Sequence, residues 1–317
     1  MPMSLNLLIV RTPFQAWLCL KLIDQLKIEN YDLIYISHND SEEDRFYFNR
    51  LSSFSSSSDY VYVRPARFDV VTHFLLRVRI WRWFHRRSYR NIYVASIDSL
   101  IINALVCRIF SATLNTFDDG VANLVKDDSL YIGLSKGRVV LYRVIFGAQS
   151  VSKIRKRIRW HYSIYAGYEN IVPSERVKHF EAWIRKPDTG LDCPEKRNLK
   201  RYFIGAPFKE VMSSEEIKKM IEFMAEVNLD GYIKHPREDV PLPINCVIIE
   251  KRGRLAEEII FEQSNECVVE LYGFFSSTMI NLKDYAEKRV VFLSGKHKLT
   301  GIGELARESG CQEIYLS

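Results

Sequence analysis

The chain has 317 residues, of which 47% are hydrophobic and 26% are charged, so it can bury a sizeable core and is not a disordered polymer. Its apolar stretches are broken by charge before they reach the roughly 20 residues that cross a membrane, and Leu5–Val10 is too short for the core of a secretory leader. The six cysteines lie far apart without a Cys-x-x-Cys pair, which favours reduced thiols in a cytosolic compartment over a disulfide framework or a zinc site.

Short β-rich apolar runs alternate with longer segments of helical period along the whole chain. In the first half we expect strands at Leu5–Val10, Leu33–Ser37, Tyr60–Val63, Asn91–Ala95, Leu114–Phe117 and Leu130–Ile132. In the second half we expect them at Tyr202–Ile204, Gly231–Lys234, Val247–Glu250, Val268–Leu271, Val290–Leu293 and Glu313–Leu316. The helical segment Ser213–Val227 opens with Ser-Ser-Glu-Glu, which is typical of a capped N-terminus.

Strand–helix alternation in both halves predicts an α/β fold with two Rossmann-like parallel-sheet domains that face each other across a cleft. Lys186–Pro194 has the turn chemistry of a linker. We therefore expect an N-terminal domain over 1–185, a linker over 186–200 and a C-terminal domain over 201–317. Ligands of parallel sheets bind beyond the carboxyl ends of the strands, so a motif that follows a strand is a candidate site.

The positive charge of the chain is concentrated in two segments without acidic residues. The net charge is +6, and Arg77–Arg90 and Lys153–Arg159 contribute six and five basic residues, so the rest of the chain carries −5. Bulky apolar side chains alternate with the basic ones: Trp81, Trp83, Phe84, Ile154, Ile158 and Trp160. We expect residues 77–90 and 153–160 to lie on an anionic membrane surface. The alternatives are solvated helix faces with the tryptophans in the core, and nucleic-acid binding, which no motif accompanies and which we do not expect.

Two adjacent carboxylates follow the expected strand Leu114–Phe117, in the sequence Asp118-Asp119-Gly120. The glycine lets the chain turn sharply after the strand, which puts the acids where a ligand binds. Mutual repulsion and partial burial can raise the pKa of one carboxyl toward a value useful for a general base. The same sequence also occurs in ordinary surface turns.

A histidine and two cations follow another expected strand, in the sequence Lys234-His235-Pro236-Arg237. The proline ends the strand and fixes the backbone directly after the histidine. Three side chains that can carry positive charge within four residues suit a phosphate or phosphodiester. The alternative is a structural histidine.

A third strand, Val268–Leu271, precedes Gly273 and a run of hydroxyl residues, Ser276, Ser277 and Thr278, that opens a helical segment. Hydroxyls and free backbone N–H groups at such a place can bind phosphate. The alternative is plain helix capping. Asp-x-Asp and metal-type His/Cys clusters are absent from the sequence, so we expect no metal and no other cofactor.

Taken together and in order, these motifs resemble those of the bacterial sialyltransferases. The local sequence is most similar to the lipooligosaccharide sialyltransferase family, glycosyltransferase family 52. The resemblance spans nearly the whole chain and includes four further stretches: Arg11–Gln15, Thr116–Asn123, Phe203–Gly205 and His235–Glu238.

The resemblance implies a GT-B fold whose C-terminal domain holds CMP-sialic acid, with inverting transfer that needs no metal. Either Asp118 or Asp119 would be the general base, and His235 would bind the departing phosphate as an acid or electrostatic stabiliser. The other implied donor contacts are Lys234, Pro236, Gly273, Ser276, Ser277 and Thr278, with Glu258, or failing that Glu257, on the cytidine ribose. Thr12 and Gln15 would contact the acceptor.

The function implied is transfer of sialic acid to a terminal galactose of lipooligosaccharide or a related surface glycan. The partners are then a nucleotide-sugar donor, a glycan or glycolipid acceptor and the anionic inner leaflet, so we expect a cytoplasmic protein, peripheral on the inner face of the membrane. The resemblance also allows a homodimer. Alternatives are a polysialyltransferase or capsular polysaccharide glycosyltransferase, and, from another class, a basic lipid- or nucleic-acid-binding module.

Overall fold

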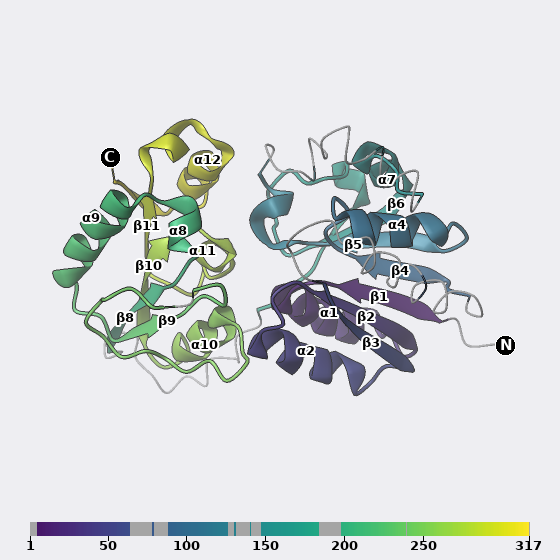
Figure 1. Ribbon diagram of the computed structural model, residues 1–317, viewed down its shortest axis with the longest axis horizontal. Coiled ribbons are helices and arrows are strands. Elements are labelled where there is room, and N and C mark those ends of the chain that lie inside the picture. The colour runs from purple at the N-terminus through teal and green to yellow at the C-terminus, as the bar shows by residue number, and fades with distance from the viewer. Residues whose placement is uncertain are drawn as a thin grey trace. The chain divides into compact units, whose positions relative to one another are not determined.

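The computed structural model describes residues 5–63, 78, 88–125, 130, 140, 147–183, 198–238 and 240–316 (Figure 1). The chain divides into two compact units, Met1–Ala182 and Trp183–Ser317. Each unit is built on one sheet, and every strand pairing among the described residues is parallel. The prediction of two parallel α/β domains is therefore confirmed.

The N-terminal unit contains a seven-stranded sheet in the order β3-β2-β1-β4-β5-β6-β7. Its strands are β1 Asn6–Val10, β2 Tyr31–Ser37, β3 Ser57–Tyr62, β4 Asn91–Val94, β5 Thr113–Phe117, β6 Ile158–Ser163 and β7 Val177–His179. Its helices are α1 Pro13–Leu26, α2 Glu42–Ser52, α4 Leu100–Arg108 and α7 Val151–Arg157, with short 3₁₀ turns at Gly120–Asn123 and Ser174–Arg176. Helices α1 and α2 pack against each other beside the sheet (Figure 1).

Local chemistry explains where these elements start. Strands β1 and β2 are almost wholly buried because helices cover parallel sheets on both faces, so their sequences read as continuous apolar runs. Thr12 caps α1 by accepting a hydrogen bond from the Gln15 backbone, and Pro13 occupies the first turn, where its missing N–H costs nothing. A capping box between Ser41 and Asp44 starts α2.

The C-terminal unit contains a five-stranded sheet in the order β12-β11-β10-β8-β9. Its strands are β8 Leu199–Ile204, β9 Gly231–Ile233, β10 Val268–Phe274, β11 Lys288–Leu293 and β12 Gln312–Tyr315. Its helices are α8 Phe208–Val211, α9 Ser214–Ala225, α10 Ala256–Gln263, α11 Ser277–Asn281 and α12 Gly301–Glu308, with a 3₁₀ turn at Gly295–Leu299.

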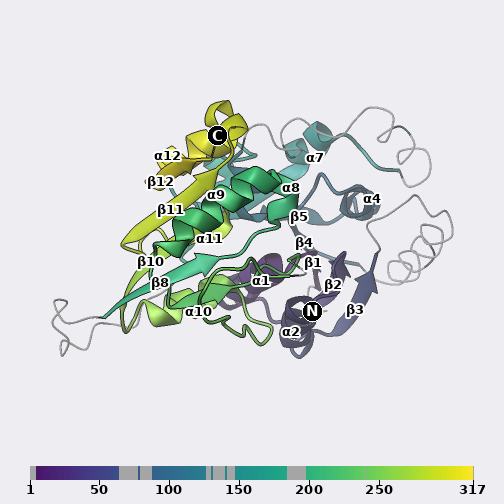
Figure 2. The ribbon, with the colours of Figure 1, turned by 60° about the vertical axis from the view of Figure 1, so that its left-hand side comes forward.

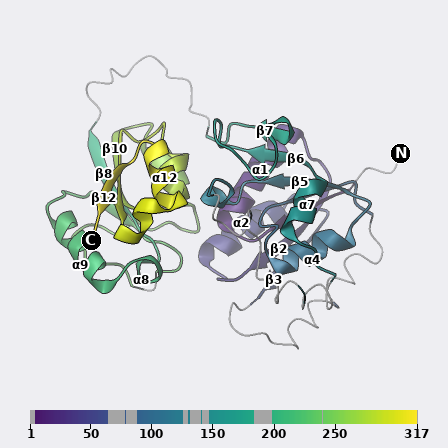
Figure 3. The ribbon, with the colours of Figure 1, turned by 90° about the horizontal axis from the view of Figure 1, so that it is seen from above.

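Helices cover this second sheet as the alternating pattern requires. Helix α9 lies along the sheet (Figure 2), where the ring of Phe223 packs against that of Phe292 on β11 with the centroids 5.4 Å apart. Helix α12 lies beside β12 (Figure 3). The capped start predicted for α9 is confirmed, because Ser213 and Glu216 form a capping box.

Three expectations about the elements need correction or qualification. Val247–Glu250 forms no strand; only Ile248 makes an isolated bridge, to Tyr232, and Val247 is 70% exposed. The sequence analysis missed β6 and β7, because charged residues interrupt the apolar pattern of both. Of the expected strand Leu130–Ile132, only Leu130 lies within the described residues.

The expected linker over 186–200 lies mostly outside the described residues. Its last two residues, Leu199 and Lys200, belong to β8, because they pair in register with Val268 and Val269 of β10.

Candidate functional site

In the N-terminal unit, polar residues gather at the carboxyl ends of β1, β4 and β5. Arg11 follows β1, Ser96 lies just beyond β4, and Asp118 and Asp119 follow β5. Because these strands are parallel neighbours, their carboxyl ends meet at one edge of the sheet. This edge is therefore the place to examine the two candidate bases.

Asp118 is fully buried and its carboxylate is used inside the protein. One oxygen accepts a hydrogen bond from the Ile164 backbone N–H at 2.7 Å, and the other contacts Nε2 of His161 at 3.0 Å. A carboxylate can only accept, so Nε2 carries the proton, and in the neutral ring Nδ1 accepts from the Thr116 hydroxyl at 2.8 Å. Asp118 thus ties β5 to β6, and its side chain does not reach the surface.

Asp119, by contrast, is partly exposed and its carboxylate is held at the sheet edge by two side chains. Nε2 of Gln15 donates to one oxygen at 2.5 Å, and the hydroxyl of Ser96 donates to the other. Burial of the carboxyl raises the pKa of Asp119, and the charge of Asp98 adds to this rise. The two hydrogen bonds and the charge of Arg11 oppose it. The result is a preorganised carboxylate whose pKa lies above its ordinary value.

The side chain of Gln15, an expected acceptor contact, is engaged inside the protein. Its side chain is fully buried: the amide oxygen accepts from the Arg11 backbone at 2.8 Å, and the amide nitrogen donates to Ser96 and Asp119. The other expected acceptor contact, Thr12, is partly exposed, and its hydroxyl caps α1. Gln15 therefore positions Asp119, and its contact with an acceptor stays a prediction.

Sequence reasoning missed three residues of this edge: Ser96, Asn123 as a partner of Asp119, and His161. Asn123 accepts a hydrogen bond from the Asp119 backbone at 2.6 Å. Ser96, with a φ of 46°, sits at the turn after β4. A polar residue just after an apolar strand is the signal that could have identified Ser96, whereas His161 lies in a strand that the apolar pattern did not reveal.

In the C-terminal unit, His235 lies on the loop after β9, and its backbone and ring are both fixed. Its backbone N–H donates to Glu238 at 3.2 Å, and its Nδ1 accepts from the Arg237 backbone at 3.1 Å. A neutral His235 ring therefore carries its proton on Nε2, the tautomer that can donate to an anion.

The buried partner of this loop is Glu238, which also accepts a hydrogen bond from the hydroxyl of Tyr232. Burial raises the pKa of Glu238. The hydrogen bonds from Tyr232 and His235 and the charges of Lys234 and Lys251 act in the opposite direction and lower that pKa. Arg237 is paired with Glu210 at 2.7 Å, so its charge is already balanced, whereas Lys234 is partly exposed and Pro236 is exposed. Of the three side chains expected to carry positive charge here, Arg237 is therefore neutralised by an ion pair, which leaves Lys234 and His235.

Two glycines permit the close packing of these strand ends. A Cβ atom at Gly205, after β8, would lie 2.7 Å from the backbone nitrogen of His235 and would also collide with Glu238. A Cβ at Gly273 on β10 would lie 2.5 Å from the carbonyl oxygen of Ile204. Both positions therefore need glycine because other backbone atoms approach closely.

Ser276 follows β10, and its hydroxyl is not used for helix capping. It occupies the N-cap position of α11 without a side-chain cap bond, and its Oγ is buried with no hydrogen-bond partner among the described residues. A buried hydroxyl without a partner is costly, so the site is built for a polar group that the protein does not supply. Ser277, the next residue, is partly exposed.

The neighbouring hydroxyl, that of Thr278, is buried and hydrogen-bonds the carboxylate of Glu257. Asn281 also donates to Glu257, at 3.2 Å, and burial raises the pKa of that carboxyl. Glu257 is thus built into the packing of α10 against α11. Glu258 is partly exposed, so of the two it is the one whose side chain reaches the surface.

His297 is a further residue at this edge that sequence reasoning missed. It follows β11, it is buried, and its ring packs edge-on against Phe274 with the centroids 5.5 Å apart. Its Nδ1 has no partner in the described part of the chain, and burial together with the charge of Lys296 lowers its pKa. No motif surrounds it, so only its position after a strand could have marked it.

His235 and Ser276 follow strands β9 and β10, which both border β8. Neighbouring strands lie about 4.8 Å apart, so the two residues start from points roughly 10 Å apart on the same edge.

The second basic segment, 153–160, is divided between α7 and β6. Ile154 and Ile158 are buried in the core, whereas Trp160 is partly exposed, and Arg157 binds the carbonyl oxygens of Val106 and Ile109 at 3.3 and 3.4 Å. The guanidinium of Arg157 also lies 4.8 Å from the ring of Phe110, which is 65% exposed. Of the first segment, 77–90, only Val78 and residues 88–90 are described.

Within the described ranges, groups of three or more metal-ligating side chains do not occur. The same residues include no helix long and apolar enough to cross a membrane.

The sequence of the chain is similar to characterised bacterial enzymes over most of its length. Residues 29–297 match the model of glycosyltransferase family 52. An N-acetyllactosaminide alpha-2,3-sialyltransferase of Haemophilus influenzae is 23% identical over 303 residues, covering 91% of this chain and 92% of that one. A CMP-N-acetylneuraminate:beta-galactoside alpha-2,3-sialyltransferase of Pasteurella multocida is 26% identical over 290 residues, covering 89% of each chain.

Solved structures share the fold. An alpha/beta-galactoside alpha-2,3-sialyltransferase from Photobacterium phosphoreum superposes with a TM-score of 0.60 at 14% identity, covering 100% of this chain and 99% of that one. The glycosyltransferase SnogD from Streptomyces nogalater gives 0.52 at 10% identity, covering 99% of this chain and 87% of that one. The two parallel α/β units therefore form the GT-B fold.

Proposed function

Because the chain belongs to glycosyltransferase family 52, we propose that this glycosyltransferase moves sialic acid from CMP-sialic acid to a terminal galactose, in an α-2,3 linkage. The observation that carries the proposal is the Asp119 carboxylate, held at the sheet edge by Gln15 and Ser96. The relatives that are similar over about nine-tenths of the chain supply the substrate class.

Asp119 is the general base of the proposed reaction. A base must be exposed enough to meet the acceptor hydroxyl and must have a pKa raised toward the working pH, and Asp119 has both properties. The complete burial of Asp118 and its bonds to His161 and Ile164 favour Asp119 over Asp118 for this role. Proton removal by Asp119 as the hydroxyl attacks the anomeric carbon gives a single displacement, which inverts the configuration.

His235 and Ser276 bind the departing CMP phosphate. The phosphate gains negative charge as the bond to the sugar breaks, so a donor on Nε2 of His235 and the hydroxyl of Ser276 stabilise the transition state. The same site is lined by Lys234, Pro236, Gly273, Ser277 and Thr278. Of these, Thr278 supports the site by its hydrogen bond to the buried Glu257. Glu258 is the residue that binds the cytidine ribose.

The proposed reaction needs no metal and no other cofactor, because Lys234 and the hydrogen-bond donors His235 and Ser276 offset the charge of the phosphate. The carboxylate on the reacting carbon of sialic acid also favours the positive charge that develops on the sugar. Hydrogen-bond donors on the CMP side and a carboxylate on the acceptor side are the arrangement that this charge pattern requires.

The acceptor we propose is lipooligosaccharide or a related surface glycan, reached at the inner face of the cytoplasmic membrane. Phe110 is exposed beside Arg157, with the exposed Lys153 and Lys156 on the same helix α7. An exposed aromatic ring among cations suits the headgroup region of an anionic leaflet.

A transfer assay with the full chain, CMP-sialic acid and an N-acetyllactosamine acceptor tests the proposal. We expect sialylated product, a rise of the melting temperature with excess CMP, and a fall in turnover of roughly a hundredfold or more for His235→Gln. The matched control His179→Gln changes an exposed histidine at the end of β7 and should keep full turnover.

Absence of both product and CMP stabilisation would favour the binding-module alternative. Products that grow into long chains on an already sialylated acceptor would favour the polysialyltransferase alternative.

A further inference from the structure

Arg11 follows β1, and its charge acts on the proposed base, Asp119. Ile9 of β1 pairs with Val94 of β4, which pairs with Thr116 of β5. Arg11, Ser96 and Asp119 follow these three neighbouring strands. The side chain of Gln15 connects Arg11 to Asp119, because it accepts from the Arg11 backbone at 2.8 Å and donates to Asp119 at 2.5 Å.

The guanidinium of Arg11 is incompletely used by the protein. Its Nε is buried, and no hydrogen-bond acceptor for it lies among the described residues. Its charge is close enough to Asp119 to lower the pKa of that carboxyl against the effect of burial. A buried donor without a partner among the described residues, close to the carboxylate of Asp119, suits a second anion that comes from outside the protein.

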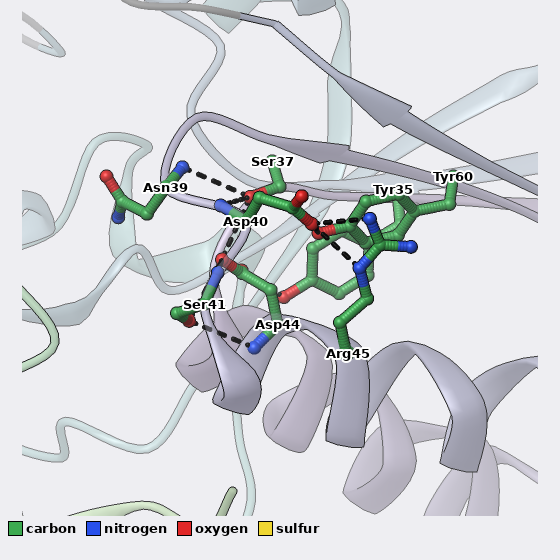
Figure 4. A network of polar contacts seen from close by, with 8 residues as sticks. All are labelled: Tyr35, Ser37, Asn39, Asp40, Ser41, Asp44, Arg45 and Tyr60. Carbon is green, nitrogen blue, oxygen red and sulfur yellow. Dashed lines mark hydrogen bonds and ion pairs between the residues drawn. The ribbon is translucent and has the colours of Figure 1, made fainter.

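The neighbouring histidine, His38, lies on a loop that hydrogen bonds connect to α2. Figure 4 shows the network that fixes this loop: Ser37 donates to Asp44 at 2.8 Å and accepts from the backbone N–H groups of Asn39 and Asp40 at 3.2 and 2.8 Å. Arg45 binds Asp40 at 2.7 Å and lies over the ring of Tyr60. The loop therefore presents His38 in one position.

His38 does not add a positive charge beside Arg11 and Asp119. Its Nδ1 lies 2.7 Å from the carbonyl oxygen of Val63, so Nδ1 carries the proton and Nε2 can only accept in the neutral ring. Burial is the main cause that lowers the pKa of His38, the charge of Arg11 lowers it further, and the charge of Asp44 opposes this. Of the pair Arg11 and His38, Arg11 is therefore the residue that carries the positive charge.

The chemistry of the proposed donor says which anion belongs there. In sialic acid the carbon that is attacked carries a carboxylate directly. A general base lies about 3 Å from the attacking oxygen, which in turn lies about 3 Å from that carbon. The carboxylate of the donor therefore comes close to Asp119, and two carboxylates in one place repel each other unless a cation accompanies them.

We propose that the guanidinium of Arg11 binds the carboxylate of the sialic acid donor. The inference rests on the proposed function, and it assigns a donor-specificity role to a residue at the carboxyl end of β1.

The test compares CMP-sialic acid with its methyl ester, which lacks the negative charge, as donors for the wild type and for Arg11→Gln. A hydrogen bond to a charged group is typically worth a factor of roughly 10 to 100, so we expect the preference for the acid over the ester, measured by kcat/KM, to fall by that factor. Affinity for CMP should not change, since CMP has no such carboxylate. Arg11→Lys should recover part of the preference.

Arg50→Gln is the matched control, because Arg50 is an exposed arginine near the end of α2. It should retain the preference of the wild type. The inference about Arg11 is overturned, and the proposed function is not, if Arg11→Gln keeps the preference for the acid or if its kcat/KM falls equally with both donors. A wild type that binds CMP and transfers from neither donor overturns the proposed function as well.

Discussion

Adjacent residues of the same type play different roles at the end of β5. Asp118 points into the protein and is satisfied by His161 and Ile164, whereas Asp119 remains partly exposed beside Gln15 and Ser96. Successive side chains of a strand point to opposite faces, and this alternation continues into the turn. The motif Asp-Asp-Gly therefore contains one structural acid and one acid available to a substrate.

Replacement of Asp119 by Asn should abolish most activity and leave stability intact. Loss of a general base lowers kcat by roughly 100- to 10,000-fold. The raised pKa of Asp119 means that the ionised carboxylate is disfavoured in the folded state, so the melting temperature at pH 7 should stay equal or rise. Steady-state kinetics and thermal unfolding measure the two quantities.

By contrast, Asp118→Ala should lower the free energy of unfolding by about 1–3 kcal/mol, because it leaves the buried donors of Ile164 and His161 unpaired.

The pH profile of the wild type gives a further check on the same assignment. A base works only when deprotonated, and the pKa of Asp119 is raised, so kcat/KM should fall on the acid side at a higher pH than an ordinary aspartate would give. Because the charge of Arg11 lowers that pKa, Arg11→Gln should move the acid limb to still higher pH. An acid limb at the ordinary aspartate value would contradict the role of Asp119.

At the scale of elements, the C-terminal site depends on loops that pack against each other at the carboxyl edge of one sheet. The loop after β9 touches Gly205 after β8, and Gly273 at the end of β10 touches Ile204 on β8. The loops are therefore coupled through backbone contacts that have no room for a Cβ atom.

Gly205→Ala should displace the backbone of His235 and weaken CMP binding. The added Cβ would lie 2.7 Å from His235 N, and relief of such an overpacked contact costs about 1–3 kcal/mol. Thermal unfolding and CMP titration measure the effect, with Gly147→Ala as the control. A Cβ at Gly147 meets no atom within 4 Å, although its φ of 74° adds about 1–2 kcal/mol of strain. CMP affinity should fall only for Gly205→Ala, and equal affinities would contradict the coupling.

At the scale of the whole molecule, basic charge and exposed aromatic residues decide the proposed contact with a membrane. Phe110→Ser should weaken sedimentation with vesicles that contain anionic lipid by about tenfold, because burial of the ring in the interface is lost. Phe54→Ser is the control, since Phe54 is 73% exposed on the turn after α2 and belongs to neither basic segment. Binding should also weaken with salt. Equal binding to neutral vesicles would refute the anionic-leaflet proposal.

The sequence alone determined the architecture and the family. Apolar runs and helical periods are local, so they revealed ten of the strands and the two parallel α/β domains, and the ordered motifs indicated glycosyltransferase family 52, which the family match confirms. Where charge interrupts a strand, as in β6, or where an apolar run makes only one isolated bridge to the sheet, as at Val247–Glu250, the local pattern gave the wrong element.

Only the tertiary structure decided which side chains of the candidate site act together. Gln15 and Asp119 are separated by 104 residues, and Asp118 and His161 by 43, so their hydrogen bonds depend on strand order and register. The same holds for the unpartnered atoms of Arg11, Ser276 and His297, because a missing partner is a property of three-dimensional surroundings. Periodicity along a chain reports burial, whereas the partner of a polar atom is chosen by neighbours that come from distant parts of that chain.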